Sequence, residues 1–437
     1  DGIRGKAGKE LSPTFLVKLG YLIGITCETE GPFLIGNDSR RSNSMIVSAL
    51  TSGLNCAGKE VWKLGLCPTP AVSFLTRKID AAGGLMVSAS HNPPEDNGIK
   101  VFNDHGKKIN TERQKLISNN LRKKHLNETL TTNNNNYGTS YDRNDLLQIY
   151  KESLISLVAP KDLNNVRIVL DLCWGSATSC AEEIFKGLGA DLIVINGEAN
   201  GNLINVKCGS TCLDPLRQKV LESNAEMGFA FDGDSDRMLA IDGKGRIIDG
   251  DHVLYLWGIE LDKDNALPEK RLVATIMTNF GLEKAWIEKG GILERTPVGD
   301  QHVHDEILAK GATLGGEQSG HILSACNDFC GDGILTALQL ATICHSKKIS
   351  LKEWRDQSFV PFPQKMINIP INTIDRLDYL QDLQKTQGAI IKAKESMGRN
   401  GRVIVRASGT EPVIRVMVEA EKESLADFWC SYISNII

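Results

Sequence analysis

The length, composition and charge of the chain describe a large globular protein of ordinary character. Its 437 residues exceed what one hydrophobic core normally supports, which predicts three or four domains. Hydrophobic residues make up 41% and charged residues 24% of the chain, and this balance excludes a largely disordered protein. The formal net charge of −4 argues against a nucleic-acid or membrane-surface binder.

Cysteine usage and hydropathy bear on the compartment. The eleven cysteines are odd in number and scattered through apolar segments, which favours reduced thiols over a disulfide framework. No apolar run approaches the ~18 residues of a membrane span, and no charged-then-apolar leader is visible. The sequence begins at Asp1 without methionine, so we expect a few residues to precede it. These features predict a cytoplasmic protein that does not contact membranes.

The predicted elements begin with a glycine-punctuated basic loop at residues 1–6 and a helix that starts at Ser12-Pro13. After this helix one unit occurs three times: a short buried strand, a small polar loop, a helical stretch, a glycine and a second strand. The first strands of the three units are residues 33–36, 166–170 and 272–276. This βαβ pattern predicts three successive α/β domains with mixed, largely parallel sheets.

The final segment differs in kind. Residues 365–371 alternate like a strand, residues 373–397 are helical with polar breaks, and residues 402–420 indicate two strands joined by a tight loop. This pattern predicts a smaller C-terminal α+β domain. The expected domains are residues 1–158, 159–250, 251–361 and 362–437.

A loop that follows the apolar run at residues 84–87 carries the first candidate site. It holds Ser90, His91 and two prolines, and it leads to Lys100. Paired prolines fix φ at two successive positions, so the Ser90 hydroxyl stands next to a segment with little conformational freedom. A polar surface turn is the plainer alternative. Because loops after parallel strands gather at one edge of a sheet, we expect this loop to lie where ligands bind.

Three carboxylates, Asp232, Asp234 and Asp236, alternate directly after an apolar strand. Crowding three negative charges is unfavourable unless a cation lies among them, which predicts a hard divalent ion such as Mg²⁺. Magnesium usually takes one or two carboxylates plus phosphate oxygens, so a phosphate is expected here too. A calcium-binding loop does not fit, because Arg237 stands where that loop needs glycine. An acidic surface turn is the alternative.

Residues 315–321 form a loop rich in glycine. This loop places Glu317, Ser319 and His321 between glycines, which let a ligand approach the backbone closely. Hydrogen-bond donors and acceptors arranged in this way suit a polyol. A structural histidine in a loop is an equally good interpretation of the motif taken alone.

The last candidate loop indicates an anion site. The guanidinium groups of Arg406 and Arg415 flank Ser408, Gly409 and Thr410. Arginine can hold a phosphate dianion through two parallel hydrogen bonds, and the hydroxyls and the turn N–H groups add donors. The alternative is a hairpin with surface arginines.

With these four loops in order, the chain resembles the α-D-phosphohexomutase superfamily. The phosphoserine, metal, sugar and phosphate loops of that superfamily are matched by residues 88–93, 232–237, 316–321 and 406–415. Within it the chain is most similar to the bacterial phosphoglucosamine mutases, through residues 1–5, 97–100, 316–321 and 415–419. The phosphomannomutase and phosphoglucomutase branch shares all four loops and is the alternative. Two residues depart from the pattern: Ser235, where the metal loop usually has glycine or alanine, and Gln301, where phosphoglucosamine mutases commonly have arginine.

The resemblance implies four domains around a central cleft and an enzyme that interconverts glucosamine 6-phosphate and glucosamine 1-phosphate. This reaction would feed the synthesis of UDP-N-acetylglucosamine and cell-wall precursors. Ser90 would be phosphorylated, and glucosamine 1,6-bisphosphate would be both intermediate and activator. The small-molecule hexosamine phosphate would be the partner, and a homodimer is one oligomeric state that the resemblance allows.

The resemblance also implies residue roles. Mg²⁺ would be held by phosphorylated Ser90 together with the three aspartates of the metal loop. Arg4 would balance negative charge, and His91, Lys100 or His321 would move the proton of the attacking hydroxyl. The residues expected to bind the substrate are Arg237, Glu317, Ser319, Arg406, Ser408, Gly409, Thr410 and Arg415.

Two other classes of function compete with this interpretation. An apolar strand that ends in Asp-x-Asp is how haloacid-dehalogenase-type phosphatases begin, with Asp232 as the nucleophile. Those enzymes usually continue with Thr or Val two residues after the second aspartate, where this chain has Asp236. A sugar-phosphate sensor without catalysis is the third class, and it would tolerate the loss of Ser90 or of the aspartates.

Overall fold

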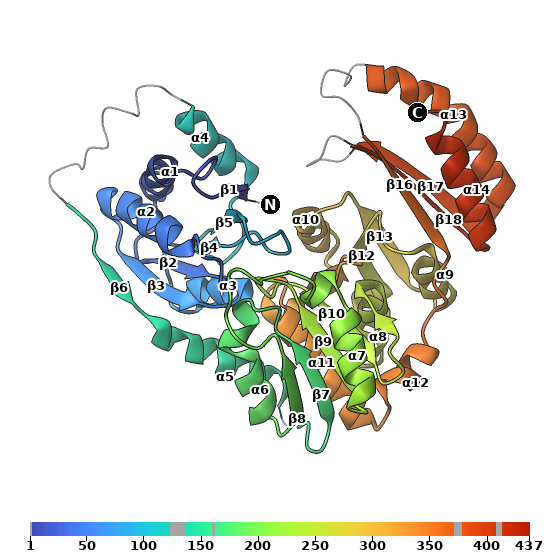
Figure 1. Cartoon of the computed structure of the whole chain (residues 1–437), viewed down its shortest axis with the longest axis horizontal. Helices are drawn as coiled ribbons and strands as arrows, with labels where there is room; N and C mark the ends of the chain where they lie inside the picture. The colour runs from blue at the N-terminus through green and yellow to red at the C-terminus, as the bar shows by residue number, and fades with distance from the viewer. Residues whose placement is uncertain (1, 123–135, 160–161, 371–377, 408–412) are drawn as a thin grey trace. The chain divides into compact units, whose positions relative to one another are not determined.

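The computed structural model describes residues 2–122, 136–159, 162–370, 378–407 and 413–437 (Figure 1). The chain divides into two compact units, and each is described by itself. The first comprises Asp1–Ile276 and Glu294–Gln357, and the second comprises Met277–Leu293 and Ser358–Ile437. Three sheets with helices between their strands and one antiparallel sheet make up the described residues, which confirms the α/β class predicted from the sequence.

The first sheet has the strand order β1-β5-β4-β2-β3-β6. The pairs β4–β2, β2–β3 and β3–β6 are parallel, whereas β5 pairs antiparallel with both β4 and β1. The predicted mixed sheet is therefore confirmed here. Its strands are β1 (Ile3–Lys6), β2 (Phe33–Asn37), β3 (Val61–Leu66), β4 (Gly83–Val87), β5 (Asp96–Phe102) and β6 (Ser140–Asp142).

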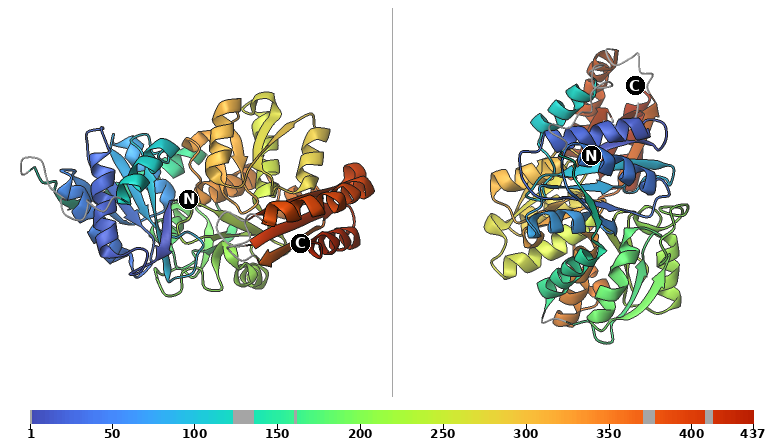
Figure 2. Two further views of the ribbon diagram at one scale, coloured as in Figure 1. Left: turned by 90° about the horizontal axis from the view of Figure 1, so that it is seen from above. Right: turned by 90° about the vertical axis from the view of Figure 1, so that its left-hand side faces the viewer.

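Helices cover both faces of this sheet, and Figures 1 and 2 show the region in blue and cyan. As predicted, the first helix begins after Ser12, whose hydroxyl accepts a hydrogen bond from the backbone N–H of Phe15. The helices of this part of the chain are α1 (Pro13–Ile25), α2 (Asn43–Cys56), α3 (Thr69–Lys78), α4 (Thr111–Leu121) and α5 (Leu147–Val158).

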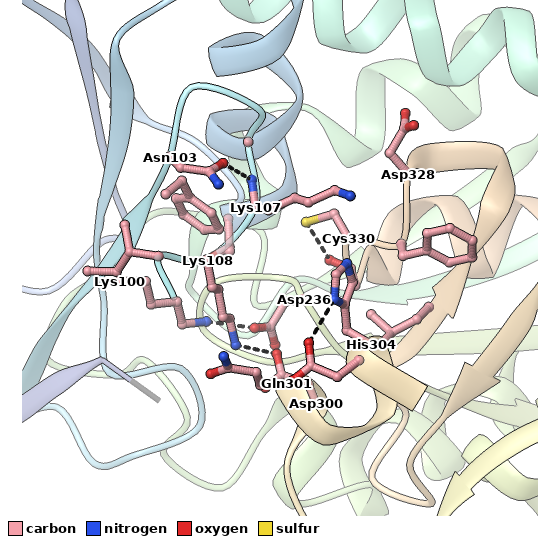
Figure 3. Close-up of a pocket in the computed structure, with 18 of the residues that line it drawn as sticks. Lys100, Asn103, Lys107, Lys108, Asp236, Asp300, Gln301, His304, Asp328 and Cys330 are labelled. Carbon is pink, nitrogen blue, oxygen red and sulfur yellow. Dashed lines mark hydrogen bonds and ion pairs between the residues drawn. The ribbon is translucent and has the colours of Figure 1, made fainter. Parts of the chain in front are cut away.

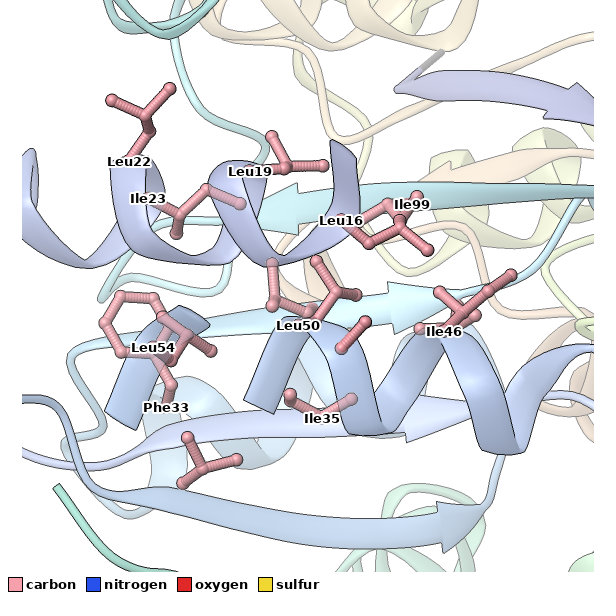
Figure 4. Packing of buried hydrophobic residues seen from close by; sticks show 14 of the residues in the cluster. Leu16, Leu19, Leu22, Ile23, Phe33, Ile35, Ile46, Leu50, Leu54 and Ile99 are labelled. Carbon is pink, nitrogen blue, oxygen red and sulfur yellow. The ribbon is translucent and has the colours of Figure 1, made fainter. Parts of the chain in front are cut away.

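The core of this region lies between α1, α2 and the sheet (Figure 4). Leucines and isoleucines at helical spacing, including Leu16 and Leu50, are buried in one cluster with Phe33 of β2. The two helices cross closely because each carries a glycine at the crossing. A Cβ on Gly20 would lie 2.4 Å from the Leu50 carbonyl oxygen, and one on Gly53 would lie 2.1 Å from a carbonyl oxygen of α1.

The second sheet has the order β11-β10-β9-β7-β8. Its β7 pairs parallel with β8 and β9, and β10 pairs antiparallel with β9 and β11. The strands are β7 (Arg167–Asp171), β8 (Asp191–Ile195), β9 (Met227–Phe231), β10 (Met238–Asp242) and β11 (Ile247–Ile248), and the helices are α6 (Ala181–Gly187) and α7 (Asp214–Glu222).

The third sheet has the order β13-β12-β14-β15, with β12 and β14 parallel and β14 and β15 antiparallel. The β14–β15 hairpin carries the loop that sequence patterns associate with a polyol. The strands are β12 (Arg271–Thr275), β13 (Ile292–Thr296), β14 (Leu314–Gly316) and β15 (Ile322–Ser324). The helices are α8 (Gly250–Lys263), α10 (Asp300–Lys310), α11 (Gly333–Lys347) and α12 (Leu351–Asp356).

The second unit contains an antiparallel sheet of order β16-β18-β17. Its core is built from small and branched residues, among them Ala393, Val416 and Cys430. The predicted strand–helix–strand–strand order is confirmed for the described residues. The elements are α9 (Phe280–Glu288), β16 (Gln364–Pro370), α13 (Asp378–Met397), β17 (Gly401–Ala407), β18 (Val413–Ala420) and α14 (Glu423–Ser434).

Short 3₁₀ helices connect these elements: η3 (Asn144–Leu146), η4 (Ser176–Ser179), η5 (Gly209–Thr211), η6 (Pro268–Lys270), η7 (Ala325–Asn327) and η8 (Gly398–Asn400). Across the described residues, no helix combines the length and the apolar character that crossing a membrane requires.

Candidate active site

The loops that follow β4 and β9 meet at their side chains. Ser90 lies three residues beyond β4, Asp232 follows β9 directly, and the Ser90 hydroxyl donates to Asp232 Oδ2 at 2.6 Å. The two residues are 142 positions apart and follow strands of different sheets. The two loops therefore bring together residues from two different sheets. Ser90 is buried and has a φ of 53°, a conformation that costs a non-glycine residue about 1–3 kcal/mol unless its surroundings impose it.

Arg40 is the first of these surroundings. Its guanidinium is fully buried and donates to the backbone carbonyl oxygens of Ser90 (3.0 Å), Asn92 (2.8 Å), Asp96 (2.9 Å) and Pro93. The planar fork of arginine can serve several acceptors at fixed angles, which a lysine ammonium cannot do. Arg40 therefore fixes the backbone of the whole loop.

Asp38 and Ser88 complete this support. Asp38 Oδ2 accepts from Arg40 Nε at 3.0 Å and from the Ser88 hydroxyl at 2.7 Å. The Ser88 hydroxyl in turn accepts from the backbone N–H of Ser90 at 2.8 Å. A continuous buried network thus connects the guanidinium to both backbone groups of Ser90.

Asn205, in the loop between β8 and η5, also holds the Ser90 loop. Its Nδ2 donates to the carbonyl oxygens of Ser90 at 2.8 Å and Asn92 at 3.0 Å. Sequence patterns gave no indication of Asn205 or of Arg40. Asp38 lies directly after β2 and two residues before Arg40. Because polar residues at that edge of a sheet face ligands, Asp38 could have indicated that this loop belongs to the site.

The three predicted carboxylates lie together. Asp232, Asp234 and Asp236 are buried and bring ligand oxygens within 4.8 Å of one another. Lys100 Nζ donates to Oδ2 of Asp234 and of Asp236, each at 2.6 Å. The Thr69 hydroxyl also donates to Asp234 Oδ2, at 2.5 Å. Within the described residues, Oδ1 of Asp234 accepts no hydrogen bond.

The carboxylates of the cluster differ in their electrostatic surroundings. Burial, followed by the charges of Asp236 and Asp234, raises the pKa of Asp232 well above its usual range. Burial opposes the charge of Lys100, but the two carboxylates that it contacts outweigh this effect and raise the pKa of Lys100. Three buried carboxylates, of which Lys100 contacts two, form a donor set that suits a hard divalent cation. These residues could therefore bind a metal ion.

His91 and His321 differ in their surroundings. His91 Nδ1 lies 3.2 Å from the Ser90 hydroxyl, and burial together with the charges of Arg237 and Arg4 lowers the pKa of His91 to about 4. For His321, burial opposes protonation, but Asp236 outweighs it and raises the pKa of His321 to about 9. At neutral pH His91 is therefore neutral and His321 is charged.

A cavity of about 390 Å³ opens beside this cluster (Figure 3). Figure 3 shows Lys100 directed to Asp236 and Lys108 directed to Asp300, with Gln301 next to Asp300. Asp300 Oδ2 also lies 3.3 Å from His321 Nε2. The volume is typical of small-molecule sites, and the wall is charged and polar.

The glycine-rich loop of the β14–β15 hairpin carries further polar groups. Glu317 is buried, and its Oε1 accepts from the backbone N–H of Gly299 at 3.2 Å. In the described part of the chain, the buried Ser319 hydroxyl and Arg237 Nε have no hydrogen-bond partner. Such groups are what a hydroxyl-rich ligand would satisfy. Arg237 also donates its backbone N–H to Asp232 Oδ1 at 3.2 Å.

The remaining predicted residues are Arg4 and those of β17, β18 and the segment between them. Arg4, on β1, donates to Asn92 Oδ1 at 2.9 Å, so it contacts the Ser90 loop. In the second unit Arg406 and Arg415 are directly paired across β17 and β18. Burial and the charge of Arg415 lower the pKa of Arg406, which indicates a place that favours an anion. Residues Ser408, Gly409 and Thr410 lie outside the described residues.

Family comparisons cover nearly the whole chain. Four families match in order: phosphoglucomutase/phosphomannomutase alpha/beta/alpha domain I at residues 1–128, domain II at 148–245, domain III at 249–362, and the C-terminal domain at 366–433. The chain therefore belongs to the phosphoglucomutase/phosphomannomutase family, which lies in the α-D-phosphohexomutase superfamily. The prediction of an enzyme of the phosphohexomutase type is confirmed.

Curated relatives within this family that resemble the chain are phosphoglucosamine mutases. The phosphoglucosamine mutase of Prochlorococcus marinus (strain MIT 9313) is 55% identical over 436 residues, which cover 100% of this chain and 93% of the relative. That of Parasynechococcus marenigrum (strain WH8102) is 57% identical over 434 residues, covering 99% and 93%. The resemblance to bacterial phosphoglucosamine mutases is thus confirmed.

Solved structures share the fold. A phosphoglucomutase/phosphomannomutase family protein from Burkholderia thailandensis matches with a TM-score of 0.84 at 22% identity, covering 100% of this chain and 95% of that one. A putative phosphomannomutase from Thermus thermophilus matches with a TM-score of 0.76 at 20% identity, covering 100% and 97%. At these identities the likeness concerns the fold alone.

Proposed function

We propose that this enzyme interconverts glucosamine 6-phosphate and glucosamine 1-phosphate through a phosphorylated Ser90 and glucosamine 1,6-bisphosphate. The observation that carries the proposal is the buried Ser90 hydroxyl, 2.6 Å from Asp232 at the edge of the acidic cluster. A hydroxyl in a fixed loop beside a cation site is what phosphoryl transfer needs, because that reaction depends on positioning and on charge neutralisation. The choice of glucosamine rests on the names of the relatives at 55–57% identity.

The cation proposed for the cluster is Mg²⁺, held by Asp232, Asp234, Asp236 and an oxygen of phosphorylated Ser90. When bound, Mg²⁺ supplies positive charge to the phosphoryl group that moves. Lys100 already lies against two of these carboxylates, so it would add a second positive charge next to the phosphate.

The proposed sugar contacts are Glu317, Ser319 and Arg237, whose polar groups are buried around the third sheet's glycine-rich loop. The phosphate that is not transferred is proposed to bind Arg406, Ser408, Gly409, Thr410 and Arg415. The bisphosphate would turn end for end between the two transfers, so that one phosphate site and one donor serve both halves of the reaction. Arg4 would balance charge near the Ser90 loop, which it contacts through Asn92.

Three side chains are proposed as candidates for moving the proton of the attacking hydroxyl. His91 is 3.2 Å from the Ser90 hydroxyl, Lys100 contacts the carboxylates, and His321 lies on the opposite side of Asp236. Their separate conservative variants, His91→Gln, Lys100→Met and His321→Gln, would rank them by the loss of kcat.

The proposal extends to organisation and setting. We propose domains at residues 1–158, 159–250, 251–361 and 362–437, close to the four family matches. We further propose a cytoplasmic enzyme in the supply of UDP-N-acetylglucosamine and cell-wall precursors, acting on a small-molecule substrate, with a homodimer as the oligomer to test.

A substrate comparison tests the activity. The full chain is assayed with glucosamine, mannose and glucose 1- and 6-phosphates, each with Mg²⁺ and a trace of the matching bisphosphate. The highest kcat/KM is expected for glucosamine phosphates. A clear preference for mannose or glucose phosphates would instead support the phosphomannomutase/phosphoglucomutase alternative.

Variants of serine test the phosphoenzyme. Ser90→Ala should abolish turnover, whereas Ser52→Ala, at an exposed hydroxyl of α2, should leave it unchanged. The trapped phosphoenzyme should survive acid and resist hydroxylamine, as expected for phosphoserine. An aspartyl phosphate on Asp232 would instead be cleaved by hydroxylamine. Full mutase activity of Ser90→Ala would refute the scheme.

A further inference from the structure

Two buried thiols lie side by side behind the Ser90 loop. Cys173, in the loop after β7, and Cys208, just before η5, have their sulfur atoms 3.9 Å apart. Cys173 is fully buried and Cys208 is 2% exposed. They come from segments separated by 35 positions, so the contact is a product of the fold and not of sequence proximity.

Asp171 holds the two segments together. Its Oδ1 accepts from the backbone N–H of Cys173 at 3.0 Å, and its Oδ2 accepts from the backbone N–H of Gly209 at 2.8 Å. Gly209 has a φ of 65°, and a Cβ there would lie 2.4 Å from Cys173 Sγ. Only glycine lets the segment of Cys208 approach Cys173 this closely. The pair is therefore positioned by a buried carboxylate and by a required glycine.

The thiols are connected to Ser90 by hydrogen bonds. Cys208 Sγ lies 3.9 Å from Cys173 Sγ and 3.7 Å from the Leu203 carbonyl oxygen, and the Cys173 thiol donates to Asn205 Oδ1 at 3.1 Å. Asn205 Nδ2 donates to the Ser90 carbonyl oxygen at 2.8 Å. The amide orientation that serves Ser90 is thus the one that the Cys173 thiol stabilises.

We propose that Cys173 and Cys208 are a disulfide-forming site, oxidised by hydroperoxides, that controls the position of the Ser90 loop. In the reaction one cysteine thiolate attacks the O–O bond to give a sulfenic acid and release water or an alcohol. The second thiolate then attacks that sulfur, the S–S bond forms, and water leaves. Two thiols lose two protons and two electrons, and the hydroperoxide accepts both.

Disulfide formation has a direct structural consequence. The sulfur atoms must approach to about 2.05 Å, and both S–H donors disappear. Asn205 Oδ1 then loses its donor, and a part-buried acceptor that has lost its partner favours reorientation of the amide. Reorientation removes the Nδ2 donor from the carbonyl oxygens of Ser90 and Asn92. The hydrogen bond with Cys208, followed by burial, raises the pKa of Cys173, so oxidation is slow and requires local opening.

The experiment uses the full chain with Ser90 phosphorylated, treated for hours with hydrogen peroxide and then blocked with N-ethylmaleimide. Peptide mass spectrometry should find a cross-link between Cys173 and Cys208 that dithiothreitol reverses. Cys212→Ser is the matched control, because Cys212 lies four residues further along the same segment. Absence of the cross-link while other thiols are oxidised would overturn the proposal.

The activity arm rests on the proposed mutase function, whereas the cross-link does not. Oxidation should lower kcat by about ten- to a hundred-fold, the range expected when a reacting group is displaced by up to 1 Å. Cys208→Ser should resist this loss, and Cys212→Ser should show it; Cys173→Ser replaces Cys208→Ser if the latter folds poorly. A cross-linked enzyme with full activity, or equal inactivation of Cys208→Ser, would overturn the control of Ser90.

Discussion

Replacing Arg40 by lysine tests whether the Ser90 loop depends on its buried guanidinium. Arg40 makes five side-chain hydrogen bonds, four of them to carbonyl oxygens between Ser90 and Asp96. Lysine has three donors, so at least two of these five hydrogen bonds are lost. Each such loss costs about 1–3 kcal/mol, which predicts about 2–6 kcal/mol of destabilisation. For a region of this size the thermal midpoint should fall by about 5–20 °C.

Activity should fall with stability, and the two effects can be separated. Below the unfolding transition, kcat of Arg40→Lys should drop by about ten- to a hundred-fold, because the Ser90 hydroxyl is no longer fixed. KM should change little, since Arg40 contacts none of the proposed sugar-binding residues. The matched control is Arg41→Lys, at an exposed neighbour that donates to Asn202 Oδ1 over a longer distance of 3.4 Å. Equal midpoints and equal kcat for Arg40→Lys and Arg41→Lys would refute the reasoning.

Three further outcomes follow from the described residues. Millimolar Mg²⁺ should raise the thermal midpoint in a thermal shift assay, because a Mg²⁺ concentration of a hundred times Kd adds about 2.7 kcal/mol to the free energy of unfolding. Asp234→Asn should remove this response. Burial raises the pKa of Asp332 to about 6, so the folded state holds its proton more tightly than the unfolded chain. The resulting stability is present below pH 4 and is lost as the pH rises through 6. Between pH 4 and 7 the free energy of unfolding of the wild type, measured with urea, should therefore fall by roughly 3 kcal/mol relative to that of Asp332→Asn. Gly20→Ala should destabilise by about 1–3 kcal/mol because its Cβ meets the Leu50 carbonyl, while Gly388→Ala, with open space on α13, should stabilise by about 0.5–1 kcal/mol; a destabilised Gly388→Ala would contradict the packing argument.

The sequence identifies strands and the loops after them because both have local signals. Hydrophobic runs such as the one before Asp232 mark buried strands, and polar residues directly after them mark the edge where ligands bind. The proximity of Ser90 and Asp232, which are 142 positions apart and follow strands of different sheets, is expected from the family resemblance of their loops and not from these local signals. The capped start of α1 at Ser12 has an equally local signal.

Long-range partners have no such signal. Arg40 occurs in a polar run, Ser39-Arg40-Arg41-Ser42, where nothing tells a buried guanidinium from an exposed one. Lys100 was a candidate proton carrier, and only the fold reveals its two carboxylate partners. Asn205 depends on how two sheets meet, which local propensities do not determine.

The contact of Lys100 with Asp234 also bears on how the protein is made. The two residues are 134 positions apart, so at 5–20 residues per second the ribosome adds the aspartate roughly 7–27 s after the lysine. During that time the nascent first sheet carries an ammonium group that has neither of its later counter-ions. The acidic loop after β9 supplies the two carboxylates that later pair with this ammonium group. The ion pair between Lys100 and Asp234 can therefore form only after both segments have been translated.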